Sequence, residues 1–134
     1  MARLHVVALS VRLPAWAEAA CAEYAKRMPK GYEISRTHVK PDRLRAALPK
    51  GARIVALDER GKDLTTVQFA ALLREPTVFV IGGADGLDAG IKKDASVLLR
   101  LSTLTLPHAL AQVVLIEQIY RAATVLTGHP YHRG

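Results

Sequence analysis

The stretch "TVFVIGG", Thr77–Gly83, decides the fold that we expect for this chain. Its apolar run is short and ends in two glycines, which is typical of a strand buried on both faces and followed by a turn. Outward from this stretch, further strand patterns occur at 3–10, 32–39, 52–59 and 96–102. Helical patterns fill the intervals at 17–28, 41–48, 65–75 and 88–95, and a long final helix is expected between Pro107 and Gly128.

Two local signals mark helix ends. Thr65 with Gln68 has the spacing of a capping box, and Gly128 stands where the end of a helix favours glycine. The alternation of strands and helices predicts an α/β fold with a mostly parallel sheet and helices on both faces. At 134 residues the chain is expected to form a single domain, 1–134.

The formal net charge of +7 has one origin in the sequence. Between Lys26 and Lys62 there are 11 Lys or Arg residues and four acids, whereas basic and acidic residues balance elsewhere. We call 26–62 the basic segment. Concentrated positive charge indicates a polyanionic partner, most commonly a nucleic acid. A solvated face that only aids solubility is the alternative.

Composition disfavours several other classes of protein. Apolar residues make up 50% of the chain, so disorder is not expected, and no apolar run approaches the roughly 20 residues that span a bilayer. The apolar run before Arg12 is too short for a secretory signal. The single Cys21 cannot form an internal disulfide, and no Cys/His spacing suggests zinc. A cytoplasmic protein with no membrane segment and no metal is therefore predicted.

The final helix carries apolar residues in nearly every direction between Leu110 and Leu126. Such a helix must be covered on both sides. One side can face the chain's own sheet and the other a second copy, which predicts a two-fold homodimer. Burial entirely within one subunit is the alternative.

Three stretches are candidates for a binding site. "IGGADG", 81–86, lies between a strand and a helix, where α/β proteins bind ligands, although it matches neither a dinucleotide fingerprint nor a P-loop. In "LSTLTLPHAL", 101–110, Pro107 delays the helix and leaves an apolar loop that displays backbone groups. The closing "GHPYHRG", 128–134, is dense in imidazole, phenol and guanidinium groups. No nucleophile–base–carboxylate set is evident, and His5 and His38 are expected to be structural residues on strands.

The chain resembles a known family in "VALDERGK", "FVIGGADGL", "LSTLTLPHALAQVVLIEQIYRA" and the closing "HPYHR". These blocks are similar to the RlmH family of SPOUT-class methyltransferases, and the resemblance covers essentially the whole chain. It implies an α/β fold whose C-terminal segment threads a trefoil knot, and a homodimer. It also implies that S-adenosylmethionine is used to methylate N3 of a pseudouridine in helix 69 of large-subunit ribosomal RNA.

The resemblance also assigns site residues. The implied cofactor-binding residues are Leu57, Gly83, Ser102, Thr103, Leu104, Thr105, Leu106 and Pro107. The implied catalytic residues in the tail are His129, Tyr131, His132 and Arg133. Pro130 also matches the family tail and is expected to stiffen it. His129 or His132 could accept the proton of the target base, Tyr131 could stack on or hydrogen-bond that base, and Arg133 could hold phosphate.

The chain departs from the family pattern in two places. "GGADG" stands where many members have "GGPEG", and the stretch 39–51, inside the basic segment, is shorter than in relatives. Two other functions compete with methyl transfer: a non-catalytic RNA- or ribosome-binding module, and a small-molecule α/β enzyme. The basic segment agrees with both RNA-directed functions, whereas the intact loop and tail favour catalysis.

Overall fold

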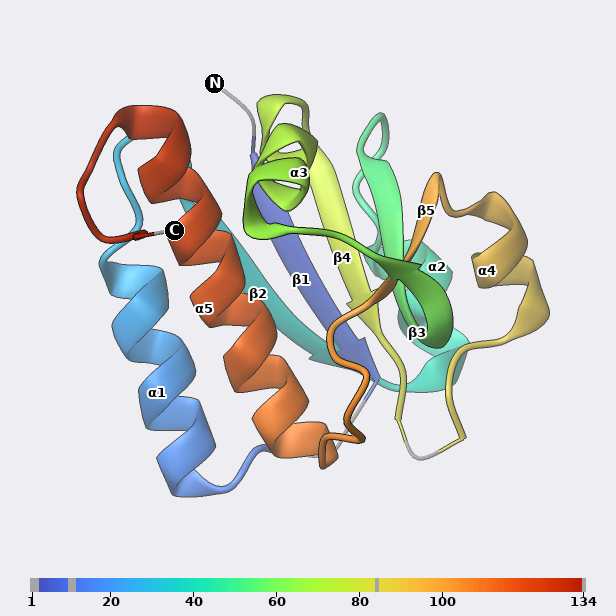
Figure 1. Cartoon of the computed structure of the whole chain (residues 1–134). Coiled ribbons are helices and arrows are strands. Elements are labelled where there is room, and N and C mark those ends of the chain that lie inside the picture. The colour runs from blue at the N-terminus through green and yellow to red at the C-terminus, as the bar shows by residue number, and fades with distance from the viewer. Residues whose placement is uncertain (1–2, 10–11, 84, 134) are drawn as a thin grey trace.

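A computed structural model describes residues 3–9, 12–83 and 85–133. Five strands form one sheet in the order β2-β1-β4-β3-β5, and all neighbouring pairs are parallel (Figure 1). The strands are β1 (Leu4–Leu9), β2 (Ile34–Val39), β3 (Arg53–Asp63), β4 (Thr77–Ile81) and β5 (Val97–Arg100). The quoted stretch forms the central strand β4, whose five residues are all buried. The predicted parallel sheet is confirmed.

Helices cover both faces of the sheet, as predicted. One face carries α1 (Ala15–Lys26), α3 (Thr66–Ala70) and α5 (His108–Thr127), which lie side by side in Figure 1. The other face carries α2 (Leu44–Ala47) and α4 (Ala89–Asp94), and two short 3₁₀ helices occupy Pro41–Arg43 and Ala71–Arg74. Each face has its own apolar core, because β1, β3 and β4 alternate their side chains between the two sides.

The predicted helix ends are present. Thr65 Oγ1 accepts the Gln68 N–H at 3.1 Å, and Gln68 Oε1 accepts the Thr65 N–H at 2.9 Å, which completes the capping box. Gly128 ends α5 with φ of 76°, a left-handed conformation that favours glycine. The helix predicted over 65–75 is shorter than expected, because its last turn is 3₁₀. Glu75 is extended because it precedes Pro76.

Strand β3 is longer than predicted and changes register against β5. Leu57 and Lys62 both pair with Leu99, so 58–61 bulge out and the strand resumes beside β5. The backbone of Gly61 lies against β5 here: a Cβ atom on Gly61 would be 2.6 Å from the Leu98 carbonyl carbon. Only glycine allows this approach. The threading of a knot stays a prediction.

Helix α5 packs between α1 and α3 through its buried residues, which include Leu115, Ile116 and Ile119. By length and composition it could also cross a membrane, with a mean hydropathy of 1.3, although the sequence showed no such apolar run. Burial against two helices and the sheet is the environment of a core helix. Its outward face is mixed: Leu110 and Val114 alternate with partly exposed Glu117, Gln118 and Arg121.

Cys21 is buried on α1, and burial raises its pKa.

Candidate functional site

An open cavity of about 740 Å³ lies where β3, β4 and β5 end. We call it the strand-end cavity. Three segments supply most of its lining: 57–60 at the bend of β3, residues 81–83 and 85–87 after β4, and the loop 99–106 after β5. Of the predicted cofactor-binding residues, the ones that line it are Leu57, Gly83, Ser102, Thr103, Leu104, Thr105 and Leu106. Pro107 does not line it and instead occupies the N-cap position of α5.

The glycines of the first turn allow close backbone packing. A Cβ atom on Gly82 would lie 2.6 Å from the Gly86 carbonyl carbon, and one on Gly83 would lie 2.8 Å from the Leu9 carbonyl oxygen. The Gly86 N–H donates to the Gly83 carbonyl at 3.0 Å and closes the turn. A side chain at position 83 would therefore push the turn away from β1 whether or not a ligand is bound. Ala84, where the chain departs from the family pattern, lies outside the described residues.

The loop between β5 and α5 combines exposed apolar side chains with backbone groups. Its Leu104 side chain is 76% exposed, and the Leu104 N–H donates to Ser102 Oγ at 2.9 Å, which turns the loop. The sequence prediction of an ordered apolar loop before α5 agrees with this geometry.

Asp58 and His108 are among the cavity residues that were not predicted from the sequence. The Asp58 carboxylate is 11% exposed and lies 3.5 Å from Lys92 Nζ. Asp58 lies within β3, where its bulge begins, and no local sequence pattern marks it. His108, the first residue of α5, also lines the cavity. Burial lowers its pKa most, His38 lowers it further, and a hydrogen bond to the Gly82 backbone opposes both.

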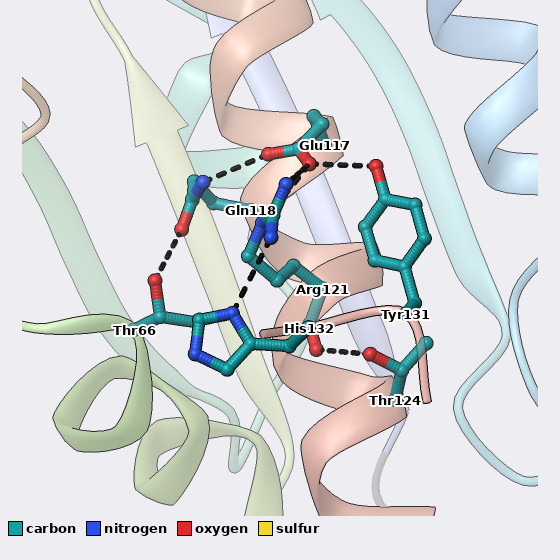
Figure 2. A network of polar contacts seen from close by, with 7 residues as sticks. All are labelled: Thr66, Glu117, Gln118, Arg121, Thr124, Tyr131 and His132. Carbon is teal, nitrogen blue, oxygen red and sulfur yellow. Dashed lines mark hydrogen bonds and ion pairs between the residues drawn. The ribbon is translucent and has the colours of Figure 1, made fainter. Parts of the chain in front are cut away.

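The C-terminal tail, His129–Arg133, folds back along α5 (Figure 1). Figure 2 shows that Glu117 is the centre of its contacts. Tyr131 Oη donates to Glu117 Oε2 at 2.8 Å, and the Arg121 guanidinium donates to the same oxygen at 2.7 and 3.1 Å. Arg121 Nη1 also donates to His132 Nδ1 at 3.3 Å. Glu117 and Arg121 were missed from the sequence, although an acid–base pair at i, i+4 in an apolar helix was a signal.

Tyr131 is a hydrogen-bond donor in this arrangement. Its ring packs edge-on against Tyr120 at 4.7 Å, and the Arg121 guanidinium lies 4.8 Å from the ring centre. Burial, followed by the Glu117 contact, raises the pKa of Tyr131 well above its ordinary value. The phenol therefore stays protonated near neutral pH and cannot serve as a base.

The two tail histidines have the same tautomer. His132 Nδ1 accepts from Arg121, and His129 Nδ1 accepts from the Tyr131 N–H at 3.2 Å. Both donors are groups that cannot accept, so each neutral imidazole carries its proton on Nε2. In both rings the Nδ1 lone pair is occupied by a hydrogen bond.

The tail and the cavity are at different levels of α5. His108 and Ala111 in the first turn line the cavity, whereas the tail contacts Glu117 and Arg121. At 1.5 Å per residue, these contacts are about 14 and 20 Å farther along the helix axis than His108. Within one chain, the structure does not bring the predicted catalytic residues to the predicted cofactor residues.

The basic segment is partly neutralised in the folded chain. Ion pairs with acids from outside the segment involve Arg27, Arg36, Arg45 and Arg53. Lys40, Arg43 and Lys50 are exposed and have no ion pair among the residues that the structure describes. Lys26, Lys30, Arg60 and Lys62 are also exposed and have no ion pair in the described part of the chain, so the remaining positive charge is spread along the basic segment and includes the three cations around α2. Within the described ranges, no group of three or more His, Cys, Asp or Glu residues could hold a metal ion.

Comparison with known proteins identifies the family. The family model for "Predicted SPOUT methyltransferase" matches residues 2–132. The chain belongs to this family. Ribosomal RNA large subunit methyltransferase H of Polynucleobacter asymbioticus is 48% identical over 145 aligned residues, which cover 98% of this chain and 99% of that protein. The alignment is longer than this chain of 134 residues, so the relative has additional residues; their placement at 39–51 stays a prediction.

Solved SPOUT-type structures have the same fold. A putative RNA methyltransferase from Bacillus anthracis matches with a TM-score of 0.59 at 18% identity, covering 96% of each chain. The SpoU methyltransferase AviRb from Streptomyces viridochromogenes, solved in complex with AdoMet, matches with a TM-score of 0.51 at 14% identity, covering 88% of this chain and 56% of that one. SPOUT methyltransferases use S-adenosylmethionine as their methyl donor.

Proposed function

We propose that this SPOUT methyltransferase uses S-adenosylmethionine to methylate N3 of a pseudouridine in helix 69 of large-subunit ribosomal RNA. The observation that carries the proposal is the strand-end cavity, which is lined by two of the candidate stretches singled out from the sequence and by Leu57, which the family resemblance assigned. The name of the 48% identical relative supports large-subunit ribosomal RNA as the substrate, and the family resemblance supports the position on the RNA.

The residues of the cavity fit the proposed cofactor. Its volume of about 740 Å³ lies within the usual range of small-molecule sites. The half-buried Leu57 and the leucines of the 101–106 loop offer apolar surface for a flat base, and the loop backbone offers donors and acceptors to its edge. The Asp58 carboxylate offers an acceptor for hydroxyl or ammonium groups. When bound, S-adenosylmethionine would supply an electrophilic methyl group on a sulfonium.

The chain's own residues would then position the RNA base and accept its proton. Methyl transfer is an in-line displacement, so orientation of the base supplies much of the acceleration. We assign the donation of a hydrogen bond to the base, or stacking on it, to Tyr131, because its raised pKa keeps it protonated. His129 or His132 would accept the proton, directly or through water, once its Nδ1 contact is released. The exposed Arg133 would hold phosphate.

The separation between tail and cavity supports a homodimer. Each tail is held at the far part of its own α5, so a complete site requires the tail of a second copy. The outward face of α5, with Leu110 and Val114 partly exposed, is the surface we assign to the two-fold contact. The site would then combine the cavity of one subunit with His129, Tyr131, His132 and Arg133 of the other.

The remaining partners follow from the same proposal. Exposed cations around α2 would contact RNA phosphates, in free RNA or in the assembled ribosome, and the cytoplasm is the expected compartment.

Two measurements test the proposal. Calorimetry with S-adenosylmethionine should show binding, and mass spectrometry of large-subunit RNA should show a methylated pseudouridine only in cells that carry the gene. RNA binding without methylation would instead indicate a non-catalytic RNA-binding module.

A further inference from the structure

A chain of three polar side chains runs from β2 to the strand-end cavity. His38 lies on β2 and Gln112 lies on α5, and their Nε2 and Oε1 atoms are 3.3 Å apart. Gln112 Nε2 is in turn 2.8 Å from His108 Nε2. His108 and Gly82 both line the cavity, and a hydrogen bond to the Gly82 backbone acts to raise the pKa of His108, so β2 is connected through these side chains to the turn that forms one wall of the cavity.

The donors and acceptors in this chain can run in one consistent direction. An amide has one accepting oxygen and one donating nitrogen, so Gln112 accepts from His38 and donates to His108. His108 must then be unprotonated at Nε2 and must carry its proton on Nδ1. That proton is the one available for the Gly82 carbonyl, which can only accept. A neutral His108 of the other tautomer could not make both of its contacts.

The buried amide makes this arrangement specific. Gln112 is 3% exposed, and burying an amide is favourable only when its polar atoms are bonded. Gly82 in turn has little freedom, because it packs against Gly86 and its neighbour Gly83 packs against Leu9. A hydrogen bond to the Gly82 carbonyl therefore acts on a tight backbone turn that lines the cavity.

We propose that Gln112 and His38 act as positioning residues: they hold His108 in the Nδ1–H tautomer, and His108 thereby orients the Gly82–Gly83 turn for the methyl donor. This inference rests on the proposed function only for the identity of the ligand. The tautomer and the turn are properties of the protein alone. Neither Gln112 nor His38 lines the cavity, so both act through His108.

The test compares Gln112→Leu with wild type by nitrogen NMR of the histidine rings and by calorimetry. In wild type we expect His108 in the Nδ1–H form. In Gln112→Leu we expect a tautomer mixture, shifted amide signals of Gly83 and Gly86, and an S-adenosylmethionine affinity weakened about threefold to tenfold, the effect of one hydrogen bond. The matched control is Gln118→Leu, which removes an amide of the same helix that contacts Thr66 and Glu117 and should leave affinity unchanged.

Two results would overturn the inference. One is an Nε2–H tautomer of His108 in wild type. The other is a loss of the tautomer preference in Gln112→Leu with unchanged amide signals and unchanged affinity. His38→Phe provides the second variant if Gln112→Leu does not fold, and it should show the same changes. If wild type does not bind S-adenosylmethionine, the proposed function fails, and the NMR measurements still decide whether the tautomer and the turn are coupled.

Discussion

The decisive prediction for this enzyme is that two separately inactive subunits can restore one active site. The first variant lacks 129–134 and keeps an intact cavity. The second keeps the tail and carries Thr105→Trp, which adds a large ring to an exposed loop residue that lines the cavity. We prefer Thr105 to Gly83, because a side chain at Gly83 would collide with the Leu9 carbonyl and alter the fold as well as the cavity.

The expected magnitude follows from geometry and pairing statistics. The tail contacts lie about 14–20 Å beyond His108 along α5, so in the proposed homodimer a tail would serve its partner's cavity and not its own. After random re-pairing at equal concentrations, half of the dimers are mixed, and each mixed dimer has one complete site out of two. The mixture should therefore recover about a quarter of the wild-type methylation rate, whereas each parent alone should be inactive.

The assay is transfer of a labelled methyl group to large-subunit RNA or ribosomes. Calorimetry should first confirm that the deletion variant binds S-adenosylmethionine and that Thr105→Trp does not. Different affinity tags on the two subunits establish that mixed dimers have formed. Purified mixed dimers that remain inactive would refute the shared site and mean that each tail moves to its own cavity.

Three further predictions test separate features. Gly61→Ala should destabilise the fold by about 1–3 kcal/mol in urea unfolding, because its Cβ would meet the β5 backbone. Gly90→Ala should cost less, because its Cβ would meet only side-chain atoms, Arg45 Nη2 at 2.9 Å and Asp88 Oδ1 at 3.2 Å. Equal effects of the two substitutions would contradict this account of β3. Arg43→Ala should weaken RNA binding and reduce the slope of log affinity against log salt concentration by about 1. Arg45→Ala should have a smaller effect, because the Arg45 guanidinium is paired with Asp94 at 2.7 Å. An RNA affinity that does not depend on salt would mean that the charge is only solubilising. The pKa of His108 is lowered by burial, so the folded state binds fewer protons at this group than the unfolded state. The contribution of His108 should therefore make the free energy of unfolding rise with pH up to about 6.5 and then level off. An identical pH dependence of the free energy of unfolding in wild type and His108→Asn would contradict this prediction.

Much of the fold could be predicted because its determinants act over a few neighbouring residues. The apolar run of β4, the capping box at Thr65 and the glycine at position 128 each act within one strand or one helical turn. The exceptions also have local causes that were not recognised. Gly61 allows β3 to continue past a bulge, and Pro76 makes the preceding residue extended, so that the helix from Thr66 ends in a 3₁₀ turn.

The cavity was predictable in part. Parallel strands place their carboxyl ends at one edge of a sheet, so loops that follow strands were reasonable candidates. This reasoning found the Gly83 turn and the 102–106 loop. It missed Asp58 and His108, because nothing local distinguishes a carboxylate or imidazole that faces a cavity from one that faces solvent.

The sequence by itself determined the elements, their alternation, and the residues of the loops and tail, since propensity, capping and apolar spacing are properties of short stretches. Only the tertiary structure decided which of these stretches meet. It separated the tail from the cavity of the same chain, paired Glu117 with Tyr131, and joined His38 to His108 through Gln112. These contacts depend on how α5 lies across the sheet, and that placement results from packing of the whole core, which no short stretch encodes.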